Sequence, residues 1–385
     1  MAPIPAYPDV TVHDTLPKLL RLNAKAHADE TWLREKDLGI WISYTWGEVA
    51  TRVRDMTLGL TTLGVSRGDV IGLIGDNRPE WLMGEIAAHA IGGMSLGIYR
   101  DALGDEVAYL VTYADVAVVF AEDEEQVDKL LSLDEKIPTV RHIVYSDPRG
   151  IRKYDDPRLI SLKELEKRGA EVAARDAGAY DRLVDTGKGE DVAILCTTSG
   201  TTSHPKLAML TGGALLRHCR AYLDMDPRLP TDEYVSVLQM PCIMKQIYAF
   251  GQALISRMKV NFVEEQETLM ADMREIGPSF VLFAPRVWEQ IAADVRSRMM
   301  DSSALKRGMF DLGMKLGLKA LDEGRRSPLA DFILFRALRD RLGFSHLKSA
   351  ATGGAALGPD TFRFFLALGV PMRHLYGQTE LLGAY

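Results

Sequence analysis

Short apolar runs and longer amphipathic segments alternate along the first half of the chain. The runs have the length of buried strands, and in residues 46–65 Val49, Val53, Met56 and Leu60 recur at helical spacing. The segment 78–93 has Pro near its start and Gly at its end, as is typical of a helix. Strands are predicted at 69–75, 94–99, 116–121 and 141–147, and helices at 46–65, 78–93, 104–114 and 123–133. This alternation indicates parallel βαβ units in a doubly wound sheet.

A second α/β pattern begins after residue 191. Its strand candidates lie at 191–196, 234–240, 257–263, 280–284, 346–354 and 371–377, and its longest helical stretch runs from 286 to 342 with an interruption at 324–328. The segment 150–190 is charged and indicates a surface connection with one helix. A chain of 385 residues exceeds what one core normally holds. We therefore predict an α/β fold of two doubly wound, mostly parallel-sheet subdomains packed together, 1–190 and 191–385, with interleaving of the two left open.

Net charge and hydropathy indicate which kinds of partner and which cellular compartment to expect. The chain has 46 basic and 53 acidic residues and a net charge of -7, which argues against a nucleic-acid backbone as the main partner. No apolar run approaches the roughly 20 residues of a transmembrane helix. The first residues, "MAPIPAYPDV", lack the basic and apolar regions of a secretion signal. We expect a cytoplasmic protein without a transmembrane segment.

The three cysteines give no sign of a metal site. Cys196, Cys219 and Cys242 form no CxxC pair and have no histidine at metal-ligand spacing. We expect reduced, buried thiols.

The segment "TTSGTTSHPK" (197–206) is the strongest candidate for chemistry. Six of its ten residues carry hydroxyl groups, a lysine ends it, and apolar runs flank it on both sides. Hydroxyls, backbone N–H groups and a lysine are what polyphosphate oxygens require, although an ordinary solvated loop has a similar composition. A Walker A loop does not fit, because Pro205 and Leu207 stand where that motif needs Gly and Ser or Thr. The segment therefore indicates a phosphate-holding loop of another type.

Four ordered motifs resemble one family. These are "TSGTTSHPK" (198–206), "APRVWEQI" (284–291), "TGGAAL" (352–357) and "YGQTE" (376–380). Together they resemble the AMP-forming acyl-CoA synthetases and other adenylate-forming enzymes, and "TLPKLL" (15–20), "YTWGEV" (44–49) and "DNRPEWL" (76–82) resemble the long-chain fatty acyl branch. The resemblance implies the fold of that family's large N-terminal domain. It also implies ATP-dependent activation of a carboxylic acid to an acyl-adenylate, followed by transfer to coenzyme A.

The resemblance also implies roles for individual residues. The phosphate loop would hold the β- and γ-phosphates, and Lys206, Thr379 and Glu380 would be catalytic, with Thr379 at the α-phosphate. Mg²⁺ would bind Thr202 and Glu380, because oxygen ligands suit that ion. The nucleotide would contact Thr198, Ser199, Gly200, Thr201, Thr202, Lys206, Gly353, Gly354, Ala355, Tyr376, Gly377, Gln378 and Thr379. The acyl pocket would be lined by Cys242, Ile243, Gln246 and Gly354.

Two positions depart from the family pattern. Ser203 stands where glycine is usual, and a side chain resists positive φ there by roughly 1 kcal/mol, so we expect a shifted loop tip with Lys206 still usable. Cys242 replaces a larger aromatic or histidine residue, and no neighbour in sequence lowers its pKa. It is expected to widen the acyl pocket, although a catalytic thiol is the alternative.

The family continues well beyond the point where this sequence ends, five residues after Glu380. Its C-terminal domain, with the ribose-binding acid and a catalytic lysine, is expected to be absent from this chain. We therefore expect a weakly active or inactive chain that forms a homodimer or associates otherwise through the surface left uncovered. Two other functions stay open: an acyl-adenylate former that loads a carrier protein, and a non-catalytic nucleotide- or acyl-binding module.

Overall fold

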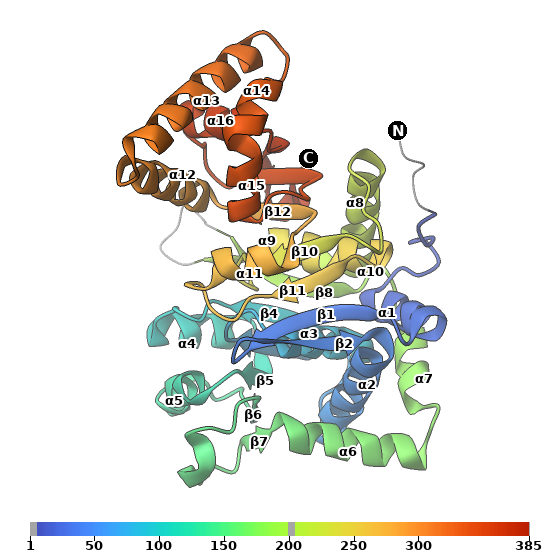
Figure 1. The fold of residues 1–385 in the computed structure, drawn as a ribbon. Helices are drawn as coiled ribbons and strands as arrows, with labels where there is room; N and C mark the ends of the chain where they lie inside the picture. The colour runs from blue at the N-terminus through green and yellow to red at the C-terminus, as the bar shows by residue number, and fades with distance from the viewer. Residues whose placement is uncertain (1–5, 199–204, 385) are drawn as a thin grey trace.

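The computed structural model describes residues 6–198 and 205–384, which build two seven-stranded sheets with helices on their faces (Figure 1). The phosphate-loop residues Ser199, Gly200, Thr201 and Thr202, together with Ser203, lie outside the described residues. The predicted α/β class with two mostly parallel sheets is confirmed.

The first sheet has the strand order β7-β6-β5-β3-β4-β8-β9. All of its neighbouring strands run parallel except the last pair, in which β9 returns antiparallel to β8. Its strands are β3 (Val70–Ile74), β4 (Met94–Ile98), β5 (Val116–Ala121), β6 (His142–Tyr145), β7 (Leu159–Ser161), β8 (Val192–Thr198) and β9 (Lys206–Thr211).

The second sheet has the order β14-β13-β12-β10-β11-β1-β2 and is antiparallel only at its β1–β2 edge. Its strands are β1 (Thr31–Asp37), β2 (Ile40–Thr45), β10 (Glu233–Ser236), β11 (Lys259–Phe262), β12 (Phe280–Phe283), β13 (Ser349–Gly353) and β14 (Met372–Leu375). A two-stranded sheet of β15 (Gly377–Gln378) and β16 (Gly383–Ala384) follows β14.

Sheet content does not follow the predicted boundary at residue 190. The early hairpin β1–β2 belongs to the second sheet, where Leu33 pairs with Val260, and the later strands β8 and β9 complete the first sheet. The two subdomains therefore exchange strands across residue 190.

One helix lies between the sheets and is buried on all sides. In α3 (Pro79–Ile91) every residue except Glu80 is buried, as expected of a helix that is apolar all round. The largest core cluster includes Trp32 and Phe262 from the second sheet and Phe120 from the first. The two sheets thus share one interior, and a separate apolar cluster packs against each sheet as well.

The helical run 245–256 is also buried throughout, and the remaining helices cover the outer faces and ends of the sheets (Figure 1). Their ends follow ordinary capping rules: Thr45 and Glu48 form a capping box at the start of α2, and Gly92 ends α3 with φ of 82°. The α-helices are α1 (Leu16–His27), α2 (Trp46–Thr62), α4 (Gly104–Tyr113), α5 (Glu124–Leu131), α6 (Leu162–Arg175), α7 (Ala179–Thr186), α8 (Gly212–Met225), α9 (Ile243–Lys245), α10 (Ala253–Ser256), α11 (Leu269–Ile276), α12 (Pro285–Met300), α13 (Ala304–Asp322), α14 (Pro328–Ala330), α15 (Arg336–Leu342) and α16 (Pro359–Ala367). Two π-helical segments, η3 (Gln246–Gln252) and η4 (Asp331–Phe335), and the short 3₁₀ segments η1 (Asp134–Lys136), η2 (Ile151–Lys153) and η5 (Thr379–Leu381) complete the set.

The segment 150–190 is more ordered than predicted. It contains the strand β7 and two helices, α6 and α7, where one helix in a surface connection was expected. Two glycines explain how α6 packs tightly on α2: a Cβ at Gly59 would lie 2.3 Å from the carbonyl oxygen of Leu165, and one at Gly169 would lie 1.7 Å from that of Asp55. The long helical stretch also breaks once more than predicted, between α12 and α13.

Candidate functional site

A pocket of about 340 Å³ opens at the carboxyl ends of the second sheet's parallel strands. In open α/β sheets, ligands usually bind in a crevice outside this edge. Four of the strands, β10, β12, β13 and β14, deliver its walls directly or through the residues that follow them. The lining residues are Leu238, Cys242, Ile243, Met244, Leu282, Phe283, Ala284, Gly353, Gly354, Leu375, Tyr376, Gly377, Gln378, Thr379 and Gly383.

Two glycines form one wall of the pocket. Gly353 ends β13, pairs with Leu375, and has so little room that a Cβ would stand 3.1 Å from the carbonyl oxygen of Leu375. Gly354 has φ of 84°, which side chains rarely adopt, and no heavy atom of the described residues lies within 4 Å of where its Cβ would stand. A planar ligand can therefore approach the backbone at Gly354 closely.

The segment 376–380 brings the pocket to the first sheet. Tyr376, Gly377, Gln378 and Thr379 line the pocket, and η5, which contains Thr379 and Glu380, contacts both β8 and β9. Those two strands carry the flanks of the predicted phosphate loop. Glu380 is exposed, and it belongs to an element that touches both the pocket and the two strands flanking the predicted loop.

The flanks of the phosphate loop are well defined. Thr198 ends β8 and Lys206 begins β9; the two residues pair across the strands, and the Thr198 hydroxyl donates to the Lys206 carbonyl at 3.5 Å. The Tyr109 hydroxyl donates to the carbonyl of Pro205 at 3.1 Å. Lys206 is exposed, so its ammonium group is available to an anionic ligand at this edge.

Cys242 lies in the wall of the pocket and is half-buried. Burial raises the pKa of its thiol, despite backbone N–H groups of Met244 and Lys245 that lower it. A nucleophilic cysteine needs a lowered pKa. The geometry therefore favours a wall residue over a catalytic thiol, and Ile243 continues the same wall.

Gln246 and Ala355, which the motifs also suggested, are not among the residues that line the pocket. The Gln246 amide points into the interior and donates to Glu85 at 3.1 Å. Ala355 is exposed just outside the pocket.

Glu85 stands at the centre of a buried polar cluster that sequence reasoning missed. The Ser95 hydroxyl donates to Glu85 at 2.8 Å, and His89 Nε2 lies 3.0 Å from the same hydroxyl. Burial raises the pKa of Glu85 to about 7 and lowers that of His89 to about 4. An isolated Glu and His four residues apart in an apolar helix are the signal that could have found them.

A buried lysine ties the pocket wall to the first sheet. The Lys245 ammonium donates to Asn77 Oδ1 at 2.7 Å and lies 5.2 Å from the centre of the Phe262 ring. Asn77 also donates to the carbonyl of Val237 at 3.4 Å. Burial lowers the pKa of Lys245 well below its usual value. These contacts hold both ends of the segment 237–245, which contains Cys242.

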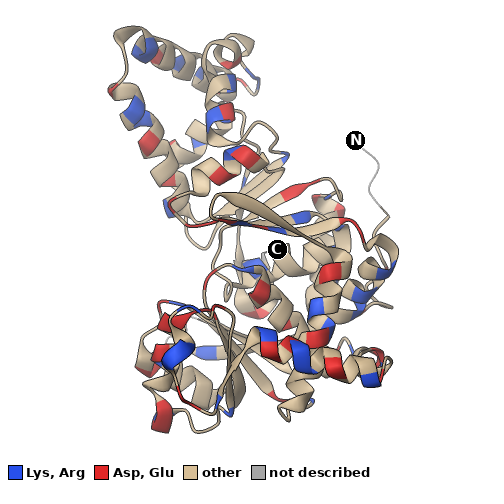
Figure 2. Cartoon of the chain, turned by 60° about the horizontal axis from the view of Figure 1, so that its bottom comes forward, with Lys and Arg blue, Asp and Glu red and all other residues tan. Residues whose placement is uncertain are grey.

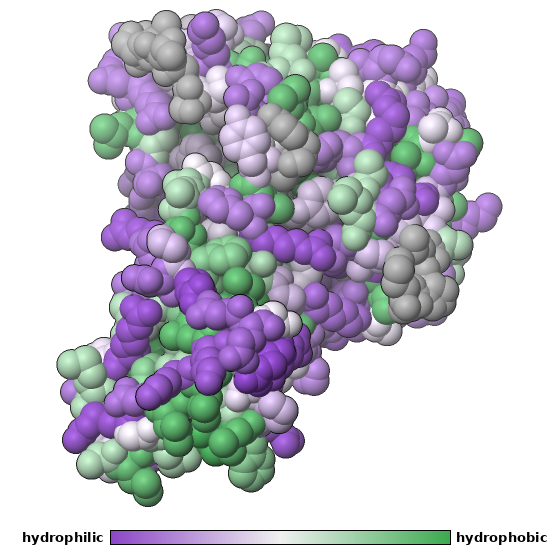
Figure 3. Space-filling model, turned by 90° about the horizontal axis from the view of Figure 1, so that it is seen from above, coloured by the Kyte–Doolittle hydropathy of each residue, from purple (hydrophilic) through white to green (hydrophobic). Residues whose placement is uncertain are grey.

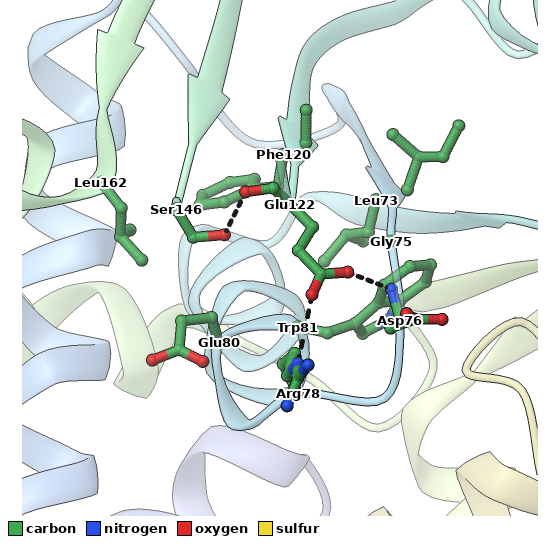
Figure 4. Close-up of a pocket in the computed structure, with 12 residues that line it drawn as sticks. Leu73, Gly75, Asp76, Arg78, Glu80, Trp81, Phe120, Glu122, Ser146 and Leu162 are labelled. Atoms are coloured by element: carbon green, nitrogen blue, oxygen red, sulfur yellow. Dashed lines mark hydrogen bonds and ion pairs between the residues drawn. The ribbon is translucent and has the colours of Figure 1, made fainter. Parts of the chain in front are cut away.

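A second, much smaller cavity of about 30 Å³ lies at the carboxyl ends of β3, β5 and β6 (Figure 4). Glu122 accepts hydrogen bonds there from the Asp76 backbone and, at 3.1 Å, from Arg78. Ser146 donates to the Glu122 carbonyl at 3.1 Å. The space suits a water molecule and not a nucleotide. The contacts of Glu122 therefore serve to fix the loop 75–78, which contains Asn77.

No group of three metal-binding side chains occurs within residues 6–198 and 205–384. Of the two predicted Mg²⁺ ligands, Glu380 is described and exposed, and Thr202 lies outside the described residues. Mg²⁺ often binds through one or two carboxylates together with substrate phosphates, so a single exposed glutamate fits this ion if the predicted loop holds phosphate.

Comparison of the sequence with models of protein families identifies the family to which these motifs belong. The family model described as "AMP-binding enzyme" matches residues 20–385. The chain belongs to this family. The predicted family is thereby confirmed, and the motifs at 198–206 and 376–380 are parts of an AMP-binding enzyme.

Long-chain-fatty-acid–CoA ligases are the relatives of this AMP-binding enzyme. It is 25% identical to ACSBG2 of Xenopus laevis over 99% of the chain and 52% of the relative. It is 29% identical to the peroxisomal long chain acyl-CoA synthetase 7 of Arabidopsis thaliana over 98% of the chain and 54% of the relative. The chain thus spans about half the length of the curated relatives it matches.

Solved structures share the fold of this AMP-binding enzyme. The anthranilate CoA ligase AuaEII in complex with anthranoyl-AMP has a TM-score of 0.71 at 16% identity, with 99% of this chain and 62% of that one covered. The long-chain-fatty-acid-CoA ligase FadD1 of Archaeoglobus fulgidus has a TM-score of 0.70 at 16% identity, covering 99% and 66%. At 16% sequence identity, these two matches show that the fold is shared.

Proposed function

We propose that this AMP-binding enzyme activates a long-chain fatty acid with ATP and passes the acyl group to coenzyme A. The observation that carries the proposal is the shared position of two motifs. The pocket lined by Gly354 and Tyr376 reaches η5, and η5 contacts the strands that end in Thr198 and begin with Lys206. One ligand can therefore touch an apolar wall, a glycine backbone and a phosphate-binding edge at once.

The proposed reaction has two steps. A carboxylate oxygen of the acid attacks the α-phosphorus of ATP, and pyrophosphate leaves with the bridging oxygen. The thiolate sulfur of coenzyme A then attacks the acyl carbon, and AMP leaves. Negative charge grows on phosphate oxygens in the first step, so fixed positive groups and hydroxyls at that place lower the barrier.

Individual residues supply these groups. Lys206 faces the departing phosphates, Thr379 donates to the α-phosphate, and Gly353, Gly354 and Tyr376 hold the adenine. When bound, Mg²⁺ on Glu380 neutralises phosphate charge. Cys242 and Ile243 face the acyl chain near the carboxylate. The names of the relatives support the long-chain acid as the substrate class.

The mostly apolar pocket wall favours a hydrophobic acid. Transfer to a carrier-protein thiol instead of coenzyme A is the second candidate, because both acceptors present the same thiol chemistry. The third candidate function is a module that binds a nucleotide or acyl ligand without catalysing a reaction.

The decisive experiment measures ligand binding and chemistry separately on residues 1–385. A non-hydrolysable palmitoyl sulfamoyl-adenosine should raise the melting temperature, because a ligand that binds only the folded state stabilises it. ATP–pyrophosphate exchange should then be measured with acids of two to eighteen carbons, followed by thioester formation with coenzyme A or a phosphopantetheinylated carrier. If the analogue raises the melting temperature but no ATP–pyrophosphate exchange is measured, the result favours a module that only binds ligand, or a chain that needs a further catalytic part. No stabilisation at saturating analogue refutes the proposal.

Lys206→Ala tests the phosphate edge within the same assays. We expect it to lower kcat/KM for ATP by about a hundredfold or more, wherever exchange is measurable, because a preorganised cation is lost. Lys25→Ala, an exposed lysine in α1, is the matched control and should leave the exchange rate unchanged. Equal rates for both variants would remove Lys206 from the site.

A further inference from the structure

The helices α12–α15 form a lobe that projects from the second sheet (Figure 1). Six large apolar side chains of the described residues are exposed on this lobe. Phe332 is 82% exposed, Leu305 is 74% exposed and Met300 is 73% exposed, and Met309, Leu312 and Leu329 are exposed as well. Exposed apolar groups gathered on one part of a protein mark an interaction surface.

These side chains have the spacing of an amphipathic helix. Leu305, Met309 and Leu312 stand at i, i+4 and i+7 on α13, and so form one stripe along it. The adjacent face of α13 packs on the lobe through Gly313 and Gly317, whose missing side chains admit Leu334 and Phe335. The helix is therefore anchored to the lobe through these glycines, while the apolar stripe is exposed. In the space-filling view, hydrophobic side chains gather on the projecting lobe at lower left (Figure 3).

A groove of about 390 Å³ runs beside this stripe between α12, α13, η4 and α15. Its floor is apolar and includes Met309 and Ile333. Arg298, Lys306 and Arg341 line it, are exposed, and make no ion pair with any described residue. Cations without partners beside exposed apolar side chains fit a ligand that is anionic and apolar together.

The charge of the lobe is opposite to that of the rest of the chain. Residues 285–342 contain twelve Lys and Arg and eight Asp and Glu, a net charge of +4, whereas the whole chain has a net charge of -7. Figure 2 shows Lys and Arg along the helices of the lobe at the top of that view. The positive charge is therefore concentrated where the apolar side chains are exposed.

We propose that the α12–α15 lobe docks on the surface of an anionic lipid bilayer. The stripe of Leu305, Met309 and Leu312 and the exposed Phe332 of η4 enter the headgroup region. Arg298, Lys306 and Arg341 face the lipid phosphates and carboxylates. This is the combination by which amphipathic helices bind membrane surfaces: buried apolar area plus attraction between basic side chains and anionic lipids. No helix among the described residues is long and apolar enough to cross a membrane, so docking is peripheral.

The shape and chemistry of the lobe favour a bilayer over other occupants. A flat surface can only touch parts of a protein that project, and this lobe projects. An acidic peptide would use the cations but leave Leu305 and Phe332 without an apolar partner. A second copy of the chain would supply an acidic surface, and self-association is therefore measured alongside.

Vesicle co-sedimentation of residues 1–385 tests the proposal. Vesicles of phosphatidylcholine with about one-third phosphatidylserine should bind the protein at about 0.1 M salt and release most of it at about 1 M, where charges are screened within about 3 Å. Leu305→Ser with Phe332→Ser, and separately Arg298→Glu with Lys306→Glu, should each weaken binding at least tenfold. The matched controls are Met225→Ser, at an 85% exposed side chain of α8, and Arg152→Glu with Lys153→Glu, at exposed residues of η2.

Several outcomes overturn the proposal. One is an absence of binding by the unaltered chain; another is equal binding to vesicles of phosphatidylcholine alone. Loss of binding in the control variants as large as in the lobe variants also contradicts it. If the chain self-associates instead, and Leu305→Ser with Phe332→Ser abolishes that association without any vesicle binding, the lobe is an interface between copies.

Discussion

At the scale of single residues, the site depends on positions where a side chain is absent or small. Gly354 combines a left-handed backbone with open space at the pocket, and Cys242 leaves room in the wall that a larger side chain would fill. The buried partners of Lys245 keep that wall in place. Substitutions that enlarge a side chain in this pocket should consequently change ligand affinity more than substitutions that shorten one.

Gly354→Ala tests the close approach of ligand to backbone. The left-handed conformation should cost about 1 kcal/mol of folding stability. We expect calorimetry to show in addition a roughly tenfold loss of affinity for palmitoyl sulfamoyl-adenosine, equal to about 1.4 kcal/mol. Gly39→Ala, in the β1–β2 turn, also has positive φ and open space and should lose stability only. Equal affinities of both variants would mean that ligand does not approach Gly354.

Cys242→Trp and Cys242→Ala separate a wall residue from a nucleophile. The tryptophan should exclude long or bulky acids while the alanine keeps ATP–pyrophosphate exchange, because the raised thiol pKa leaves little thiolate at neutral pH. Exchange rates across the acid series measure both effects. Complete loss of exchange in a folded Cys242→Ala variant would point to a chemical role for the thiol.

At the scale of elements, the order of the motifs along the chain predicted which segments form the pocket, but not which way each side chain in a helix points. Cys242, Gly354 and Tyr376 were expected in one site and do line one pocket. Gln246, four residues after Cys242, was expected in the acyl pocket and does not line it. The π-helical segment η3 begins at Gln246, and its side chain points toward Glu85 instead. Sequence spacing gives the order of residues along the chain, whereas this turn depends on packing.

Local patterns found the buried strands but not the edge hairpin. The strands β3 and β5 are buried along their whole length and stand out as apolar runs. The hairpin β1–β2 was not predicted, because β2 is an edge strand with few buried residues and shows no clear alternation. Which sheet each strand joins depends on pairing between distant residues, and no local pattern encodes that.

The contact of α2 with α6 gives a prediction at the scale of elements. Gly169→Ala places a Cβ against the Asp55 carbonyl, so the helices must separate; we expect a loss of about 2–4 kcal/mol in the free energy of unfolding by urea. Gly308→Ala, inside the exposed part of α13, meets nothing within 4 Å among the described residues and should instead gain up to about 1 kcal/mol. A Gly169→Ala variant as stable as the unaltered chain would contradict the packing described above.

At the scale of the whole molecule, the two sheets are joined through a shared interior that contains charged groups. Glu85 on α3 accepts from Gln246 on η3 and from Ser95 on β4, and so links two buried helices to a strand of the first sheet. A carboxyl group buried there should make the stability of the whole fold depend on pH.

Glu85→Gln reports that dependence. The pKa of Glu85 is raised to about 7 in the folded protein, above its unfolded value of 4.5, so its stabilising contribution is complete below pH 4.5 and is lost as the pH rises through 7. The difference in unfolding free energy between the variant and the unaltered chain should therefore favour the variant more at pH 8 than at pH 5, by roughly 2–3 kcal/mol. His89 is present in both proteins and cancels.

Urea titrations at the two pH values measure this difference. Glu135→Gln removes an exposed carboxylate that forms no ion pair with a described residue, and it serves as the control. A difference for Glu85→Gln that stays constant from pH 5 to pH 8 would show that the carboxyl titrates alike in the folded and unfolded chain.

The exchange of strands between the sheets has a consequence for synthesis on the ribosome. Leu33 in β1 pairs with Val260 in β11, 227 residues later, so β1 emerges long before its partner. At typical elongation rates of 5–20 residues per second this delay is roughly 10–45 s. During that time Trp32 and Leu33 lack the neighbours that bury them, and the nascent hairpin is a target for chaperones. Slower translation before residue 260 should lengthen this exposed interval and lower the yield of folded protein.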